Sequence, residues 1–238
     1  MKTLNQSGRY LLSGLLGGLI IISMLISSCA KDDTGPILEG TVKLMIVNAA
    51  SGSAAQDFYL DNTKVNTEAV AYSQSTSYIS ADAGSSRKAE FKNNGSTTVN
   101  FTGFVDLVPN ENYTFFYTGK ADGSGNSSAV FRDEKTSPSS NKAKLRFVNL
   151  AEGFASANLL ITGGASLASN IAFGTASEFM EVDPGSLSLQ TAIAAGLSGS
   201  ADLGTFTLVA GKIYTIYTSG SLTGSAGSAV SAKMLAHN

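Results

Sequence analysis

The run Lys43-Leu44-Met45-Ile46-Val47-Asn48 (KLMIVN) decides the fold, because it returns as Lys144-Leu145-Arg146-Phe147-Val148-Asn149 (KLRFVN). Lys43–Ala49 is a short and nearly continuous apolar run, as expected of a strand in a packed sandwich. Sliding the chain on itself by 101 residues aligns positions 43–127 with 144–228 without a gap, and 21 of the 85 pairs are identical. A period this long predicts a repeated domain rather than a short structural repeat.

The repeat divides the chain into two expected domains. These are residues 38–140 and residues 141–238, the second an internal repeat of the first at an offset of 101. The boundary falls in Glu134–Asn141, a polar, proline-containing run of the kind that links domains. A domain of about 100 residues can bury one modest core without disulfides.

Each repeat consists of short apolar or alternating segments separated by turn signals, such as the hairpin signal Asn93-Asn94-Gly95. No capped helical pattern follows Cys29, although alanine-rich residues 190–197 could support a helical turn. We therefore expect an all-β fold: two tandem immunoglobulin-like or prealbumin-like β-sandwiches with about seven strands each. The expected strands are 43–49, 57–60, 77–81, 88–92, 99–107, 112–118 and 129–131, then 145–150, 158–161, 178–182, 187–193, 204–209, 213–219 and 229–236.

The first thirty residues predict export. Lys2 and Arg9 give the chain a positive start and are followed by the uncharged stretch Leu11–Ser28. Small residues then come directly before the single cysteine, Cys29. A positive start, an apolar stretch and a small-residue cleavage site make up a secretory signal. The alternative is a membrane-spanning anchor, because 18 apolar residues can just cross a bilayer. The small residues beside Cys29 favour the cleaved signal.

Leu25-Ile26-Ser27-Ser28-Cys29 resembles the lipobox of bacterial lipoproteins, where signal peptidase II cuts before the cysteine and the cysteine carries the lipid. The resemblance implies that residues 1–28 are a cleaved lipoprotein signal peptide. Residues 29–37 would then be the lipidated cysteine and a tether. Several acyl chains, such as palmitate, would anchor the protein stably.

The residues after Cys29 bear on the destination. Ala30 directly after the cysteine implies the outer membrane, and Lys31-Asp32-Asp33 is similar to the short charged export signal of surface-exposed lipoproteins. The same charged run could be an ordinary solvated tether. We expect a protein anchored in the outer membrane by its lipid, on the cell surface or on the periplasmic face.

Both repeats resemble the secreted bacterial family catalogued as domain of unknown function 4397. The pattern opens with an apolar strand ending in Val47-Asn48-Ala49, followed by Gln56-Asp57-Phe58-Tyr59-Leu60. Later pieces occur in both repeats, at Tyr78–Gly84 with Phe179–Gly185 and at Tyr113–Gly119 with Tyr214–Gly220. The second repeat departs from the pattern at Asn158, which stands in the place of Asp57. The resemblance implies extracytoplasmic β-sandwich modules and carries over no activity.

Composition argues against several classes of function. With 16 Lys and Arg against 18 Asp and Glu, the chain is not basic, so we expect no nucleic-acid partner. One cysteine and one histidine, His237, leave little for catalytic triads or zinc sites. Neither a phosphate-binding glycine motif nor Gly-x-Ser-x-Gly occurs. We expect no cofactor, no metal ion and no catalytic residue.

Five side chains are candidate binding residues. Asn48 and Asn149 recur at one repeat position and could make a duplicated polar contact, or could satisfy loop backbone at a strand end. Tyr113 and Tyr214 also recur and could stack on a sugar, or could pack as half-buried strand residues. The fifth is Asp57, which with Asp61 flanks an expected strand.

Two groups of carboxylates have alternative interpretations. Asp57, Asp61 and Asp82 could form a calcium site, or could be turn residues at strand ends. Glu178, Glu181 and Asp183 could include a carboxylate pair for glycosidic cleavage. The sequence supplies no apolar pocket that would raise the pKa of one of them.

Together these features predict a non-catalytic, lipid-anchored cell-envelope protein. Its β-sandwich modules would serve adhesion, assembly or ligand holding, with the membrane as a partner through Cys29 and an envelope protein or polysaccharide as another. The alternative is a carbohydrate-binding accessory lipoprotein, which exposed, coplanar aromatic side chains would distinguish. A hydrolase, the third hypothesis, would need a concave site with two carboxylates at catalytic separation.

Overall fold

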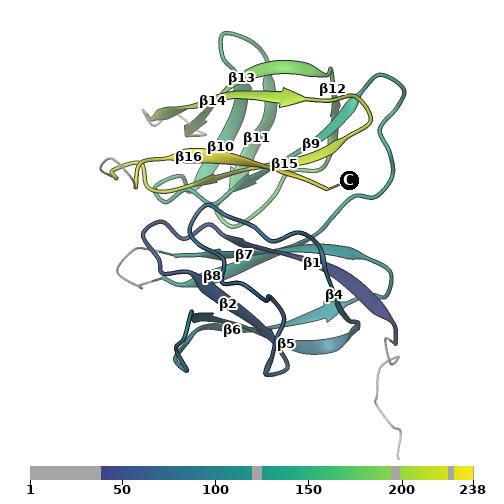
Figure 1. Ribbon diagram of the computed structural model, residues 1–238. Helices are drawn as coiled ribbons and strands as arrows, with labels where there is room; N and C mark the ends of the chain where they lie inside the picture. Colours follow the sequence, from purple (N-terminus) through teal and green to yellow (C-terminus); the bar gives the residue numbers. More distant parts are fainter. Residues whose placement is uncertain (1–38, 120–124, 194–198, 225–227, 238) are drawn as a thin grey trace, which may run out of the picture. The chain divides into compact units, whose positions relative to one another are not determined.

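Every regular element in the described part of the chain is a β-strand, which confirms the expected all-β fold. The computed structural model describes residues 39–119, 125–193, 199–224 and 228–237 (Figure 1). Within these ranges no helix is long and apolar enough to span a membrane. The expected signal peptide, Cys29 and the tether to residue 37 lie outside the described residues.

Sixteen strands follow one another in the residues that the structure describes. The first eight are β1 (Thr41–Asn48), β2 (Gln56–Leu60), β3 (Thr63–Lys64), β4 (Ile79–Asp82), β5 (Gly84–Asn93), β6 (Val99–Leu107), β7 (Asn112–Thr118) and β8 (Ser127–Arg132). The second eight are β9 (Ala143–Asn149), β10 (Ser156–Ile161), β11 (Ser166–Ala172), β12 (Met180–Val182), β13 (Gly185–Ile193), β14 (Ser200–Leu208), β15 (Ile213–Ser219) and β16 (Ser231–Ala236).

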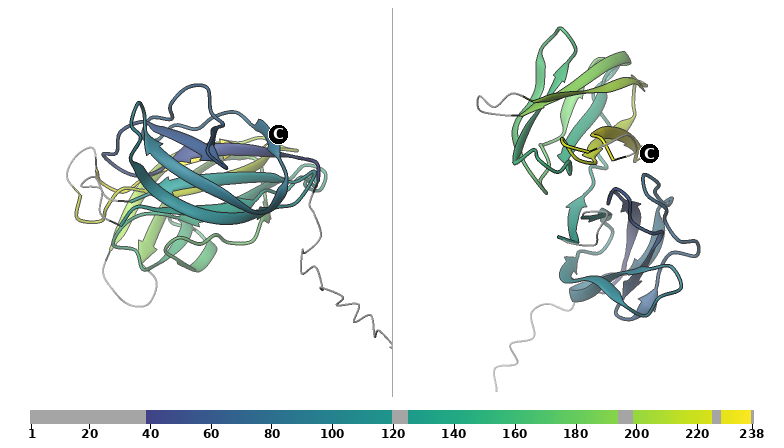
Figure 2. Two further views of the ribbon diagram at one scale, coloured as in Figure 1. Left: turned by 90° about the horizontal axis from the view of Figure 1, so that it is seen from below. Right: turned by 90° about the vertical axis from the view of Figure 1, so that its left-hand side faces the viewer.

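Each set of eight strands forms two four-stranded sheets, and the two sets have the same strand order. The sheets of the first half are β4-β1-β7-β8 and β3-β2-β5-β6, and those of the second half are β12-β9-β15-β16 and β11-β10-β13-β14. The central pairs β1–β7 and β9–β15 are parallel. The result is two sandwich-like units, seen in two further views in Figure 2. The exact boundary at residues 140 and 141 stays a prediction.

All the expected strands occur, with ends that differ by a few residues. The hairpin predicted at Asn93-Asn94-Gly95 joins β5 to β6, and Gly95 has the positive φ, 75°, that such a turn needs. Residues 190–193 belong to β13 rather than to a helical turn, and residues 194–198 lie outside the described part. The prediction missed β3, which has only two residues, and β11, whose sequence SLASNIA is poor in strand-forming residues.

Three clusters of buried side chains hold the strands together. The first packs Phe58 against Phe91 and Phe115, with ring centroids 5.0 and 4.9 Å apart. The second lies between the sheets of the second half, around Phe147, Phe154 and Leu159, which are all buried. The third joins residues of β1 and β7 to residues of β9 and β15.

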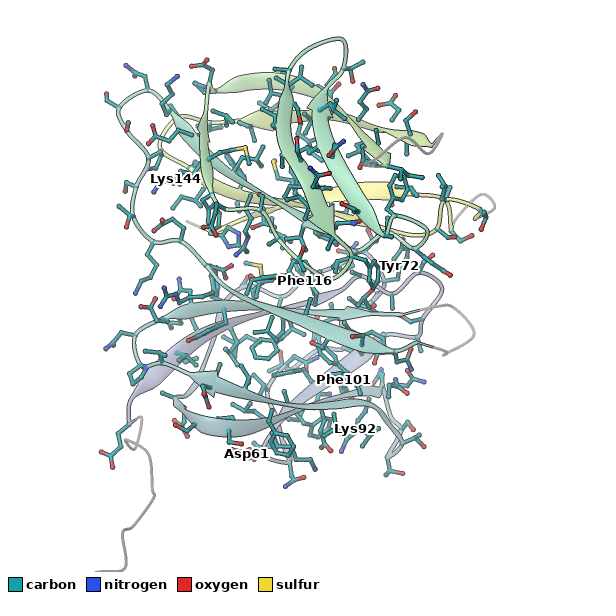
Figure 3. The ribbon with its side chains drawn as sticks, turned by 180° about the vertical axis from the view of Figure 1, so that it is seen from behind. Asp61, Tyr72, Lys92, Phe101, Phe116 and Lys144 are labelled. Atoms are coloured by element: carbon teal, nitrogen blue, oxygen red, sulfur yellow. The ribbon has the colours of Figure 1, made fainter. Side chains whose placement is uncertain are left out.

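This third cluster explains why the deciding sequence runs are apolar on both faces. Val47 and Phe116 pack in it with Val148 and Tyr217, and the ring centroids of Phe116 and Tyr217 are 5.2 Å apart. Figure 3 shows where Phe116 lies. The opposite faces of the same strands line the two sandwich cores. Residues Gly35–Asn238 accordingly form one compact unit that contains all three clusters.

Candidate functional site

A closed ring of hydrogen bonds is buried where residues of the two halves meet. Asp133 follows β8 in the connection to the second half, and its Oδ1 accepts from Nη2 of Arg146 in β9 at 2.7 Å. Arg146 Nε donates to Oγ1 of Thr215 in β15 at 3.1 Å, and this oxygen lies 2.7 Å from His237 Nε2. His237 Nδ1 lies 2.7 Å from the Tyr78 hydroxyl, which donates to Asp133 Oδ2 at 2.8 Å.

The donors and acceptors around the ring fix the state of the histidine. The single hydroxyl proton of Tyr78 goes to Asp133, so the Tyr78 oxygen must accept from His237 Nδ1. His237 Nε2 is then unprotonated and accepts from Thr215, which frees the Thr215 oxygen to accept from Arg146. A second proton on the imidazole would break this order.

Burial sets the charges in the ring. It lowers the pKa of His237 to about 4; Asp133 opposes the shift and Arg146 adds to it. Burial also raises the pKa of Tyr78, and the neighbouring Asp133 carboxylate raises it further. The charged pair is therefore Arg146 and Asp133, whose side chains are 4% and 0% exposed. The Arg146 guanidinium also lies 4.6 Å from the Phe179 ring centroid, which adds a cation–π contact.

The carboxylates considered for catalysis hold the connection between the halves. Glu181 accepts from both the backbone N–H and the hydroxyl of Ser139, each at 2.7 Å. These hydrogen bonds lower the pKa of Glu181. Asp183 pairs with Lys142 at 2.8 Å. Glu181 thus holds Ser139, inside the segment that the sequence identified as a linker, whereas Asp183 makes an exposed ion pair with Lys142, just after that segment.

The aspartates considered for calcium face basic side chains. Asp57 pairs with Lys64 at 2.7 Å, and Asp61 pairs with Arg87. The Arg87 guanidinium also donates to the backbone oxygen of Asp82. In the described ranges no group of three or more His, Cys, Asp or Glu side chains is placed to hold a metal ion.

The five predicted binding residues are all buried, each no more than 6% exposed. The Asn48 amide donates to the backbone oxygens of Ala54 and Val70, and that of Asn149 to those of Phe154 and Ile171. The hydroxyls of Tyr113 and Tyr214 accept from backbone N–H groups at equivalent positions, Val108 and Val209. Direct contact of these side chains with a ligand stays a prediction, and we build no site on it.

A pocket of about 400 Å³ lies at the ends of the four central strands. The end of β1 supplies Ala49, that of β7 supplies Thr118, and the segment after β9 supplies Leu150 and Phe154. Other wall residues are Gly119, Gly125, Glu152, Gly153, Ala155, Phe173 and Gly220. The wall is thus mostly apolar side chains and glycine backbone, with Phe173 exposed by 45% at its rim. Such a concave, largely apolar site suits a small ligand.

The predicted asparagines position this pocket without lining it. By holding the Phe154 carbonyl at 2.9 Å, the Asn149 amide fixes the loop that carries the Phe154 ring into the wall. Gly220 closes the other side, and no larger residue fits there. Its φ is +87°, and an added Cβ would lie 2.3 Å from the Ala229 backbone oxygen.

Sequence reasoning did not identify the aromatic residues of the pocket, Phe154 and Phe173, or the buried ring. Phe154 and Phe173 stand in loops with no pattern of their own, so nothing distinguished them. Arg146 did carry a signal, because it interrupts an apolar strand where the first repeat has Met45. A charge at a position buried on both faces requires a buried partner, which the structure provides in Asp133.

Comparison with known families finds one match. A domain of the family described as "Domain of unknown function (DUF4397)" is found at residues 42–159. The match covers the first half and runs on into β9 and β10 of the second. No curated protein matches the chain.

Three solved structures are distantly similar to the chain. The C-terminal domain of AlgF from P. aeruginosa has 19% identity and a TM-score of 0.31, over 41% of this chain and 99% of that one. A carbohydrate-binding module of family CBM26 from Eubacterium rectale, in complex with maltoheptaose, has 9% identity and a TM-score of 0.26, over 83% and 96%. A protein from Bacteroides uniformis that is proposed to act in cell adhesion has 14% identity and a TM-score of 0.23, over 83% and 99%. At these scores none of the three bears on function.

The buried ring predicts that the protein loses stability in mild acid. Below pH 6.5 the unfolded chain protonates His237, whereas the folded chain does so only near pH 4. The unfolded state then binds more protons, so the free energy of unfolding falls as the pH falls, by about 1.6 kcal/mol from pH 6.5 to 5. Urea denaturation at several pH values between 6.5 and 5 measures this change in the free energy of unfolding.

The control is His237→Gln, which removes the single histidine of the chain. This variant is expected to be less stable at pH 7 and to show no decline between pH 6.5 and 5. An equal decline in both proteins would contradict the assignment to His237.

Proposed function

We propose that the chain is a non-catalytic, lipid-anchored protein of the bacterial cell envelope that binds a ligand through its β-sandwich modules. The observation that carries the binding role is the apolar pocket at the ends of the central strands. Its walls are set by parallel strands packed on both faces and by the Asn149 amide, so the pocket is held by rigid elements. Two of the carboxylates considered for catalysis, Glu181 and Asp183, instead contact Ser139 and Lys142 near the connection between the halves.

The lipid anchor rests on the sequence before the fold. Residues Leu25–Cys29 resemble a lipobox, and the described fold begins about a dozen residues later, with β1 at Thr41. A tether of this length would hold the sandwiches close to a membrane surface. We propose the outer membrane as the site of anchoring, with two copies of the family domain displayed on the cell surface or on the periplasmic face.

Lipidation at Cys29 is tested by metabolic labelling with an alkyne analogue of palmitate. The wild-type protein is expected to take up the label and to enter the detergent phase of a Triton X-114 partition. Cys29→Ser should lose both properties, because the chain has no other cysteine. Protease treatment of intact cells then separates the two faces, since only a surface protein is cleaved. Wild-type protein that stays in the aqueous phase would contradict the anchor.

A carbohydrate ligand is the second candidate, and the rim of the pocket favours it. Phe173 is an exposed aromatic residue of the pocket wall, and Glu152 is a polar residue of the same wall. Sugars stack on aromatic rings and hydrogen-bond to polar groups beside them. The same site could take another small amphipathic ligand, which the following experiment separates from a sugar.

Glycan-array binding tests the sugar directly. If a glycan is the ligand, Phe173→Ala is expected to weaken binding at least about tenfold, the loss of about 1.4 kcal/mol. Val209→Ala is the control, because Val209 is 53% exposed and is not part of the pocket wall. An array on which the wild-type protein binds nothing would remove the carbohydrate hypothesis and leave the pocket for a different ligand class.

A further inference from the structure

Strand β6 is an unprotected sheet edge. It pairs with β5 on one side, and no strand of the described residues pairs with it on the other (Figure 1). At nine residues, β6 and its counterpart β14 are the longest edge strands in the described part of the chain. Edge strands leave a row of backbone groups unpaired and invite another strand, so proteins usually blunt them with lysine, proline or a bulge.

The usual protections are absent from the middle of β6. Its sequence VNFTGFVDL contains no lysine and no proline, and the one charge, Asp106, lies near its end. Phe101–Val105 pair one-to-one with Arg87–Phe91, and both irregularities of register lie outside this segment. An exposed large side chain stands at the same place: Phe104 is 69% exposed.

Strand β14 occupies the same position in the second half but is protected. Gly204, the counterpart of Gly103, has a φ of +85°, and the register with β13 shifts beside it. The side chain of Asp202 accepts from the Gly204 N–H at 2.9 Å, so a central edge donor is already occupied. The residue in the place of Phe104 is Thr205. The open edge is therefore particular to β6.

The alternation of inward-facing and outward-facing side chains in β6 is compatible with antiparallel pairing of two copies of the strand about Gly103. In an antiparallel pair with this centre, Phe101 faces Val105 of the other copy, and Thr102 faces Phe104. Phe101 and Val105 both pack towards the first core, whereas Thr102 and Phe104 both point outwards. The two Phe104 rings become diagonal neighbours, within reach of each other. The two Asp106 carboxylates stay about 20 Å apart along the strands, so no like charges face each other.

We propose that β6 pairs with β6 of a second copy of this chain, antiparallel and centred on Gly103. The contact joins two four-stranded sheets into one sheet of eight strands and covers both Phe104 side chains. The same surface patch is used on both copies, so the assembly closes as a dimer. This interface goes beyond the proposed function and requires neither the lipid anchor nor the pocket.

The test uses residues 35–238, the compact unit that contains every described strand and all three core clusters. This fragment lacks Cys29, so its behaviour is independent of lipidation. Sedimentation velocity up to about 0.5 mM is expected to show a concentration-dependent dimer. Phe104→Lys should raise the dissociation constant at least about tenfold, because it places charges at the centre of the contact. Thr205→Lys, the matched change in β14, should leave it unchanged.

The register is tested by disulfide trapping between two single-cysteine fragments. A mixture of the Thr102→Cys and Phe104→Cys fragments is expected to form a disulfide-linked dimer faster than either fragment alone, since these positions face each other. Circular dichroism melting of each variant shows whether it folds. Three results would overturn the proposal: a wild-type fragment that stays monomeric at the highest concentration, equal weakening by Thr205→Lys, or no preference for the mixed disulfide.

Discussion

Asp133 and Arg146 are charged and almost fully buried, and this pair constrains the structure around it. Two buried charges are tolerated only when each has its partner and its remaining hydrogen bonds. In this protein Tyr78, Thr215 and His237 supply the remaining hydrogen bonds, and His237 closes the ring. The hydroxyl of Thr114 also donates to Asp133, at 2.7 Å. These residues lie in both halves of the chain, so the ring is complete only when the halves are joined.

The central strands make that junction apolar everywhere else. β1 and β7 in the first half, and β9 and β15 in the second, are buried on both faces, one towards a sandwich core and one towards the shared cluster. Residues at and just after the ends of these strands, including Ala49, Thr118 and Leu150, line the pocket. The pocket lies at those ends, so its position follows from the same arrangement that brings the halves together.

Much of the fold could be predicted from the sequence, because most strands and turns depend on the residues of short local segments. The apolar runs at Lys43 and Lys144, the hairpin at Asn93 and the polar linker each depend on neighbours in the chain. β3 and β11 could not be predicted in this way, since an edge strand with exposed or small residues has no apolar pattern. The buried ring was also out of reach, because its members are far apart in sequence. Asn149, a predicted binding residue, is buried and does not line the pocket. It contributes to the pocket by holding the loop that carries Phe154.

Calorimetric melting of residues 35–238 examines directly whether the ring makes the two halves one cooperative unit. Arg146→Met gives the second half the residue that the first has at Met45, and it leaves Asp133 buried without its partner. The wild-type fragment should melt in a single transition with equal calorimetric and van't Hoff enthalpies. The variant should lose about 3–5 kcal/mol and melt in two transitions, one for each half. A variant that melts like the wild type, or a wild-type fragment that already melts in two steps, would contradict this view.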